Sequence, residues 1–354
     1  MRKDMLKDML KAISPVDEAA CAACIARFDQ VAKPVGSLGK LETLLAQISA
    51  VYGSAEIDIT KKCVLVFCAD NGVTARGVSQ SGQEVTSAIA RMLANGRSGV
   101  CVMAKACGAE VFPVDVGMAD TVHGLLPRKL MHGTADISRG PAMARETAIK
   151  AIDLGIALVK EKKEQGYKLI ATGETGIGNT TTASAMASVL LGVPVETVTG
   201  RGAGLDDEGL LRKRAAIAEA IRVNAPDASD PIDVLIKVGG LDIAAMAGAY
   251  LGGALYRVPI VMDGVISAVA ALAAVRLNAA VRGYIIPSHI SAEPAARLIC
   301  KALDMEPILH AELRLGEGTG AAALFPLLDM AAAVYHNAAT FADIKVDAYK
   351  RQPC

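Results

Sequence analysis

The chain has 354 residues, with 37 basic and 37 acidic side chains, so its formal net charge is zero. Hydrophobic residues make up 52% of it, enough to bury a large core. Because the charges balance and no long block of one sign occurs, nucleic acids and anionic membranes are not expected as partners.

The cysteines and the first residues favour a cytoplasmic protein with reduced thiols. Eight cysteines are scattered along a chain that opens "MRKDMLKDMLKA", without an apolar signal-peptide run. Cys21 and Cys24 have redox or zinc spacing, but no second Cys or His pair accompanies them, so we interpret them as core residues of a helix. The histidines also lack metal-ligand spacing, and no metal site or cofactor is predicted.

The two ends of the chain have helical patterns and no strand pattern. We predict that residues 1–50 and 325–354 pack together as a small helical domain, and that residues 51–324 form a large α/β domain. Apolar runs in the large domain alternate with Ala- and Leu-rich helical patterns, at 62–72, 109–117, 167–180, 258–265 and 283–291. Uniformly apolar runs predict a parallel, Rossmann-like sheet with helices on both faces.

Polar residues follow these strands, where the ligands of parallel sheets bind. Asp70, Asp115 and Asp263 stand at such ends, as do 173–180 and 288–291. The loop after the first strand, "CADNGVTARGVSQSGQEVT" (68–86), adds Asn71, Ser79, Ser81 and Gln83. We expect it to contact a small polar or aromatic ligand.

The segment "GETGIGNT" (173–180) matches the Walker A pattern at each fixed position except the lysine, where Asn179 stands. Its glycines and the start of the following helix predict a site for a monophosphate rather than a triphosphate. A glycine-rich structural turn is the alternative. Because a carboxylate is repelled by phosphate, we expect Glu174 to face ribose hydroxyls or a base.

A second glycine run, "VTGRGAGLDDEGLLRKR" (198–214), precedes a helix that Asp206–Glu208 would begin. Arg212, Lys213 and Arg214 follow within one turn, so one of them is a candidate anion ligand, and a solvated basic face is the alternative.

The most apolar region, 241–275, is interrupted by three charged residues, leaving no run of about 18 apolar residues. It therefore predicts buried core rather than a membrane span.

The segment "LRLGEGTGAAALFPLL" (313–328) places Glu317 between Gly316 and Gly318 at the entrance of a helix. A carboxylate on such a loop suits a general base, although ordinary solvation is the alternative.

These segments together resemble the nicotinate-nucleotide:dimethylbenzimidazole phosphoribosyltransferases of cobalamin nucleotide-loop synthesis. The similarity covers almost the whole chain, in the order "KPVGSLGKLE", "ADNGV", "GQEVT", "GETGIGNTTT", "TGRGAGLDDEGL", "GGLDIAAMAGAYLGGA", "MDGVISAVAAL", "PSHISAEPA" and "LGEGTGAAA". The resemblance implies that a benzimidazole nitrogen displaces nicotinate from C1′ of nicotinate mononucleotide, giving α-ribazole 5′-phosphate with inversion. It also implies a parallel α/β sheet and a small helical domain.

The resemblance assigns roles to individual residues. Glu317 would be the catalytic base, with Glu174 near the reacting sugar and Lys213 at the matching basic position. The other expected substrate contacts are Gly176, Ile177, Gly178, Asn179, Thr180, Gly202, Asp263, Ser291 and Leu315, with Ser79, Ser81 and Gln83 on the wall of the acceptor pocket.

The acceptor and the assembly stay open at this point. Dimethylbenzimidazole is the expected acceptor, with adenine or a phenol as alternatives, and members of the family form dimers. We therefore expect a homodimer, or a heterodimer with a paralogue. From another class, a non-catalytic nucleotide-binding subunit is the competing interpretation, and a P-loop NTPase is disfavoured because Asn179 replaces the lysine.

Overall fold

In the computed structural model, which describes residues 3–350, six parallel strands form one sheet. They lie in the order β3-β2-β1-β4-β5-β6, with bounds β1 (Lys62–Ala69), β2 (Glu110–Gly117), β3 (Leu126–Pro127), β4 (Leu169–Thr175), β5 (Ile260–Met262) and β6 (Ile285–Pro287). This is the strand order of doubly wound Rossmann folds, so the predicted α/β class is confirmed. Each predicted apolar run contains a strand, whereas the two-residue β3 was not predicted.

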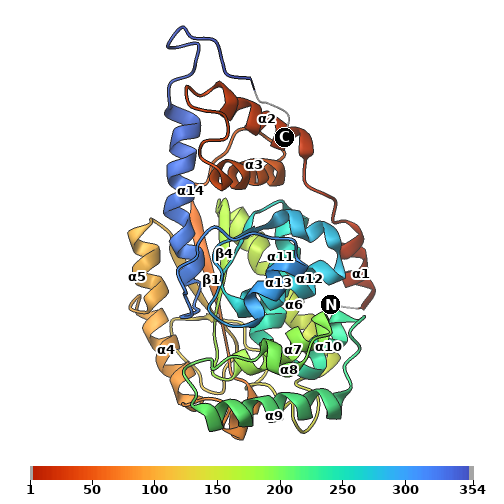
Figure 1. The fold of residues 1–354 in the computed structure, drawn as a ribbon. Coiled ribbons are helices and arrows are strands. Elements are labelled where there is room, and N and C mark those ends of the chain that lie inside the picture. The colour runs from red at the N-terminus through yellow and green to blue at the C-terminus, as the bar shows by residue number, and fades with distance from the viewer. Residues whose placement is uncertain (1–2, 351–354) are drawn as a thin grey trace.

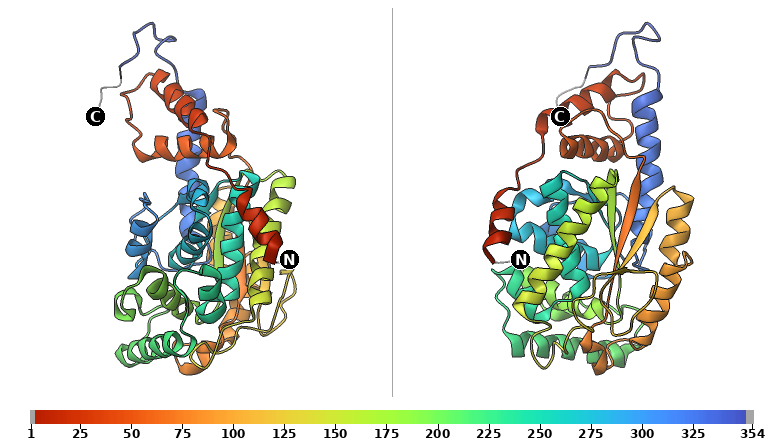
Figure 2. Two further views of the ribbon diagram at one scale, coloured as in Figure 1. Left: turned by 90° about the vertical axis from the view of Figure 1, so that its right-hand side faces the viewer. Right: turned by 180° about the vertical axis from the view of Figure 1, so that it is seen from behind.

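Helices cover both faces of the sheet, as the uniformly buried β1 requires (Figures 1 and 2). The helices are α1 (Lys3–Lys11), α2 (Glu18–Gln30), α3 (Lys40–Tyr52), α4 (Glu84–Ala94), α5 (Gly99–Ala106), α6 (Arg145–Glu164), α7 (Asn179–Leu191), α8 (Val195–Val198), α9 (Asp207–Asn224), α10 (Pro231–Val238), α11 (Leu241–Tyr256), α12 (Val265–Leu277), α13 (Ala295–Ala302) and α14 (Thr319–Asn337). Two 3₁₀ turns, η1 (Gly72–Arg76) and η2 (Ala279–Tyr284), complete the set.

Alternate side chains of β1 enter two separate cores. Leu65 and Phe67 pack into the core that contains residues of α6, α11 and α12, whereas Val64 and Val66 pack into the core with residues of α3, α5 and α14. Because side chains of a strand alternate between its faces, an uninterrupted apolar strand needs a core on each side. The sheet is therefore a rigid platform whose carboxyl edge carries the loops described below.

Helices α2 and α3 pack beside the far end of α14, which starts at the carboxyl edge of the sheet and extends past its amino edge (Figure 1). The rings of Phe28 and Tyr335 lie 4.8 Å apart, and Val31 pairs with Thr340. Helix α14 is continuous across residue 325, and α1 packs against α6 instead of this group. The division at residues 50 and 325 stays a prediction.

Candidate active site

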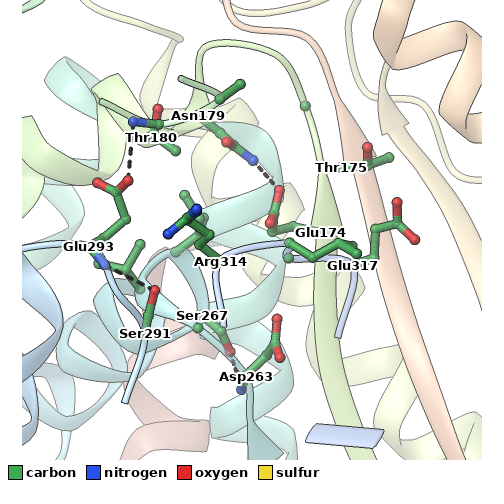
Figure 3. A pocket seen from close by; sticks show the side chains of 18 of the residues that line it. Glu174, Thr175, Asn179, Thr180, Asp263, Ser267, Ser291, Glu293, Arg314 and Glu317 are labelled. Atoms are coloured by element: carbon green, nitrogen blue, oxygen red, sulfur yellow. Dashed lines mark hydrogen bonds between the residues drawn. The ribbon is translucent and has the colours of Figure 1, made fainter. Parts of the chain in front are cut away.

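A cavity of about 290 Å³ lies beyond the carboxyl ends of β4, β5 and β6 (Figure 3). Its wall includes the 174–180 segment, residues 202–203, the loops after β5 and β6, residues 314–317 and one face of α4. The predicted residues that line it are Glu317, Glu174, Gly176, Ile177, Asn179, Thr180, Gly202, Asp263, Ser291 and Leu315. Of the residues expected at the strand ends, Asp263, His289, Ser291 and most of 174–180 line this cavity, whereas Asp70 and Asp115 do not.

One end of the cavity is formed by the start of α7. Gly178 is the N-cap residue with a φ of 92°, a left-handed conformation that suits glycine. Beside it, the Ile177 N–H donates to Thr86 Oγ1 at 3.1 Å, which fixes the loop against α4. The first residues of α7, Asn179 and Thr180, line the cavity at the positive end of the helix dipole. Gly178 itself is not among the lining residues.

Lys213 lies directly behind this end. Asp206 caps α9 by accepting from the Gly209 N–H, as the sequence predicted, and the helix buries Lys213 with 0% exposure. Arg212 is exposed and forms an ion pair with Glu208 instead. Lys213 Nζ donates to Thr180 Oγ1 at 2.8 Å, and no carboxylate of the described residues lies within 4.0 Å of it. Burial lowers the pKa of Lys213 to about 8, although the negative charge of Glu293 acts in the opposite direction and raises it.

Two buried carboxylates share one amide at the floor of the cavity. Asn179 Nδ2 donates to Glu174 Oε2 and, at 3.0 Å, to Asp242 Oδ2. Burial, followed by the charge of Asp242, raises the pKa of Glu174 to about 8, and burial raises that of Asp242 to about 6. Only Glu174 lines the cavity, because Asp242 lies behind it at the start of α11.

Glu317 occupies the predicted loop at the entrance of α14. Its φ is 61°, a left-handed conformation uncommon for a residue other than glycine, and the next residue, Gly318, caps the helix. The Glu317 N–H donates to the Glu174 carbonyl at 3.2 Å, and Oε2 accepts from the Val100 N–H at 3.3 Å, in the first turn of α5. A Cβ on Gly173 would collide with the Glu317 carbonyl, so glycine at 173 permits this close approach.

The carboxylate of Asp263 is bonded to the protein backbone. It accepts from the N–H groups of Gly320 at 2.8 Å and of Gly318 and Ala321 at 3.1 Å. These groups stand at the start of α14, where backbone donors lack helical partners. Asp263 therefore fixes the start of α14, directly after the loop that contains Glu317, and it also lines the cavity.

Apolar side chains form the other side of the cavity. Val85 and Ile89 of α4 line it together with Leu315, whose side chain is 58% exposed. The predicted acceptor-loop residues lie just before α4 and do not line the cavity, namely Ser79, Ser81 and Gln83. In the same loop, Gln80 donates to the Gly204 carbonyl, which joins it to the second glycine run.

The phosphoribosyltransferase family model DBI_PRT matches residues 13–346 of the chain. The chain belongs to this family. A nicotinate-nucleotide–dimethylbenzimidazole phosphoribosyltransferase of Acetivibrio thermocellus is 45% identical over 350 residues, which are 98% of this chain and 100% of that protein. The enzyme of the same name from Ruminiclostridium cellulolyticum is 48% identical over 326 residues, 92% of this chain and 93% of that one. The crystal structure of the Thermus thermophilus enzyme of this name superposes with a TM-score of 0.87 at 38% identity, covering 94% of this chain and 99% of that chain.

Several lining residues of this family member were not selected from the sequence. Glu293 accepts from the Gly202 N–H at 3.1 Å, and the Arg314 side chain lies in the cavity between Glu293 and Glu174 (Figure 3). Both belong to segments that were quoted for other residues, so a survey of every charged residue near strand ends would have found them. Val85 and Ile89 gave no such signal, because they read as ordinary apolar positions of α4.

The described residues contain no cluster of three or more His, Cys, Asp or Glu side chains arranged to hold a metal ion. Residues 3–350 likewise include no helix long and apolar enough to cross a membrane. The cysteines among them are all free, and Cys24 is buried in α2 as predicted, whereas Cys21 is half-buried.

Proposed function

We propose that this protein transfers the 5-phosphoribosyl group from nicotinate mononucleotide to an aromatic base, with 5,6-dimethylbenzimidazole as the expected acceptor. The products would be nicotinate and α-ribazole 5′-phosphate, inverted at C1′. The printed names of relatives that match over nearly the whole chain support this reaction.

One observation carries the proposal: a helix start backed by a buried lysine and a buried carboxylate lie on opposite sides of a single cavity. Thr180 stands on one side and Glu317 on the other, with Glu174 between them (Figure 3). The start of α7 and the buried Lys213 ammonium favour a phosphate at the Thr180 side. A phosphorylated ribose bound there would extend toward Glu174 and Glu317.

The chemistry requires one proton acceptor and a leaving group that departs without added charge. One nitrogen of the acceptor attacks C1′ while Glu317 takes the proton from the other nitrogen. The bond from C1′ to the pyridinium nitrogen breaks, and its electron pair returns to that nitrogen, which leaves as a neutral ring nitrogen. Val100 N–H, by donating to Glu317 Oε2, orients this carboxylate.

The apolar side of the cavity suits the body of an aromatic acceptor. Val85, Ile89 and Leu315 offer dispersion contacts close to the Glu317 carboxylate, since the Leu315 and Glu317 side chains both lie against Gly99. Roles for Ser79, Ser81 and Gln83 at the acceptor remain part of the proposal, and would require the loop before α4 to contact the bound base.

The test is a transfer assay with purified protein, nicotinate mononucleotide and dimethylbenzimidazole, measuring both nicotinate and α-ribazole 5′-phosphate. Equimolar formation of the two is expected, and absence of both would favour a non-catalytic nucleotide-binding subunit. Competition between dimethylbenzimidazole, adenine and p-cresol, compared as kcat/KM, identifies the acceptor. A dominant preference for p-cresol would replace the acceptor but retain the transfer.

The assembly and location belong to the same proposal. We expect a cytoplasmic homodimer, or a heterodimer with a paralogue. Met92, Val102 and Met330, which are 40%, 61% and 56% exposed in this isolated chain, are candidate interface residues. Sedimentation equilibrium of the purified protein measures the assembly, and a concentration-independent monomer would contradict it.

A further inference from the structure

Asp242 is a buried acid that the transfer chemistry leaves unexplained. It stands in the first turn of α11, is 0% exposed and does not line the cavity. Its Oδ2 is nevertheless connected to Glu174 through Asn179. Asp242 is therefore placed to act on a residue that faces the substrate, without touching the substrate itself.

The shared amide provides one hydrogen for each carboxylate. A side-chain amide has two N–H groups, and Asn179 directs one to Glu174 and the other to Asp242. Asp242 Oδ1 also accepts from the Ile243 N–H at 2.9 Å. None of the ion pairs within the described residues includes either carboxylate, so two ionised groups would be buried without a counterion. Such a pair strongly disfavours double ionisation.

Asn71 supplies an independent sign of a proton at this position. Its Oδ1 is buried and has no hydrogen-bond donor among the described residues. A Cβ built on Gly240 would lie 2.9 Å from this oxygen and 2.5 Å from Asp242 Oδ1, so both acceptor oxygens border the space beside Gly240. Asn71 Nδ2 donates to the Ile177 carbonyl at 3.4 Å. If the Asn71 side-chain amide were rotated by 180°, its oxygen would face that carbonyl oxygen, so the rotated amide is disfavoured. A hydrogen on Asp242 Oδ1 would bring a donor to the space that the unpartnered Asn71 oxygen borders.

We propose that Glu174 and Asp242 hold a single proton between them at neutral pH, and that Asp242 is a positioning residue which keeps the cavity-facing Glu174 carboxyl protonated. The functional part of this inference rests on the proposed transfer reaction. Two acids that interact this strongly titrate as a pair. Burial of both groups raises their pKa values, to about 8 for Glu174 and about 6 for Asp242, which leaves one proton on the pair between these values.

The other titratable groups around the pair add to the same effect. Asp70 after β1, Asp263 after β5 and Glu317 before α14 are acids, and each opposes further negative charge on the pair. The buried Cys68 thiol of β1 is also near, and its pKa is raised by burial. Three basic side chains lie nearby. Lys213 donates to Thr180, Arg314 lines the same cavity as Glu174, and His289, whose pKa is lowered by burial, lies beside Asp263. None of the three forms an ion pair with Glu174 or Asp242 within the described residues.

Infrared spectroscopy of the ligand-free protein tests the shared proton directly. The wild-type spectrum at neutral pH should contain the carbonyl band of a buried, protonated carboxyl, and this band should disappear as the pH rises through about 8. Glu174→Gln should remove the band at neutral pH. Asp242→Asn should move its titration at least about one pH unit lower, and Asp242→Glu should restore it toward wild type. Absence of the band from the wild type, or no shift in Asp242→Asn, would overturn the inference.

Binding measurements test the consequence for the substrate. Calorimetry with ribose 5-phosphate should show that wild-type affinity falls more between pH 7 and 9 than that of Asp242→Asn, by about tenfold, because only the wild-type pair gains a second charge there. Lys213 also titrates in this range, but it is present in both proteins and cancels in the comparison. A purely structural role for Asp242 would lower affinity equally at each pH and would overturn the proposed role.

Thermal unfolding of each variant shows whether the fold is retained, and the wild-type titration tests the shared proton even if a variant does not fold. Failure of the transfer assay with a normal infrared titration would reject the enzyme function alone. Normal transfer without the protonated carboxyl would reject this inference alone.

Discussion

Buried lysines have different partners at the two edges of the sheet. At the amino edge, Lys62 is 5% exposed and its Nζ lies 2.8 Å from Asp329, while Lys162 is 2% exposed, stacks 3.5 Å from the Phe112 ring and donates to Gln165 at 3.0 Å. At the carboxyl edge, Lys213 is 0% exposed and has only the Thr180 hydroxyl as a hydrogen-bond partner within the described residues.

We interpret this difference as one between charges that complete the fold and a charge that, in the proposed function, would bind a ligand. A buried ammonium is costly unless a carboxylate, a ring or several acceptors surround it, and the amino edge supplies these partners. Lys213 lacks them, while the start of α7 beside it adds further positive potential. In the proposed function an incoming phosphate would complete this site, and the carboxyl edge would then sacrifice some stability for binding.

The largest expected effect is a loss of kcat that occurs when a carboxylate is replaced at the carboxyl edge but not when one is replaced at the amino edge. Glu317→Gln should lower kcat by about 10²- to 10⁴-fold, because the amide cannot take the acceptor's proton, while nicotinate mononucleotide should still bind. Steady-state kinetics and calorimetry measure the two quantities. Asp329→Asn is the matched control: it leaves Lys62 without its ion-pair partner and should lower the melting temperature but retain kcat within about twofold. Wild-type turnover in Glu317→Gln would remove the residue from the mechanism.

The buried lysines themselves provide the second comparison. Lys213→Met should weaken binding of nicotinate mononucleotide by about 10- to 100-fold, the usual effect of losing one charge-assisted hydrogen bond. Lys162→Met, at the amino edge, should leave this dissociation constant unchanged. Calorimetry with the mononucleotide and with its unphosphorylated riboside locates the loss, because riboside affinity should be the same in wild type and Lys213→Met. An equal loss for both ligands would place Lys213 away from the phosphate.

A smaller effect concerns stability. Burial lowers the pKa of Lys213 to about 8 from its ordinary 10.5, so the unfolded chain binds this proton more tightly than the folded protein does. The resulting cost to the fold is complete below about pH 8 and fades as the pH rises toward 10.5. The stability of wild type relative to Lys213→Met should therefore increase over this range, by on the order of 1–3 kcal/mol. Urea unfolding of both proteins at several pH values measures it, and a constant difference would contradict the burial argument.

The sequence was informative wherever chemistry left a local pattern. Uniformly apolar runs predicted the parallel sheet, and polar residues after them predicted the edge at which the cavity lies. The glycines around Glu317 predicted its loop at the entrance of α14, because glycine spacing excludes a regular helix there.

Features that depend on distant contacts could not be predicted in this way. Asp242 was interpreted only as an interruption of an apolar run, since its link to Asn179 joins residues 63 positions apart. Asp263 was expected to bind substrate, whereas the structure shows three backbone bonds to the start of α14, and its role at the substrate stays a prediction. Lys213 could be distinguished from Arg212 and Arg214 only by resemblance, because burial decides the matter and has no local signature.

The smallest expected effect is that of metal removal. In the proposed transfer, nicotinate leaves C1′ of a pyridinium as a neutral ring nitrogen, so no negative charge develops on the leaving atom that a Lewis acid would need to stabilise. In this proposal the phosphate is not a reacting group, and its charge would be balanced by Lys213 and the start of α7. Dialysis against EDTA should therefore leave kcat and KM within about twofold of the untreated enzyme, whereas Glu317→Gln assayed beside it marks the loss expected when a catalytic group is missing. Loss of activity on chelation, with recovery on addition of Mg²⁺ or Zn²⁺ alone, would show that the transfer needs a metal ion and would overturn this part of the mechanism.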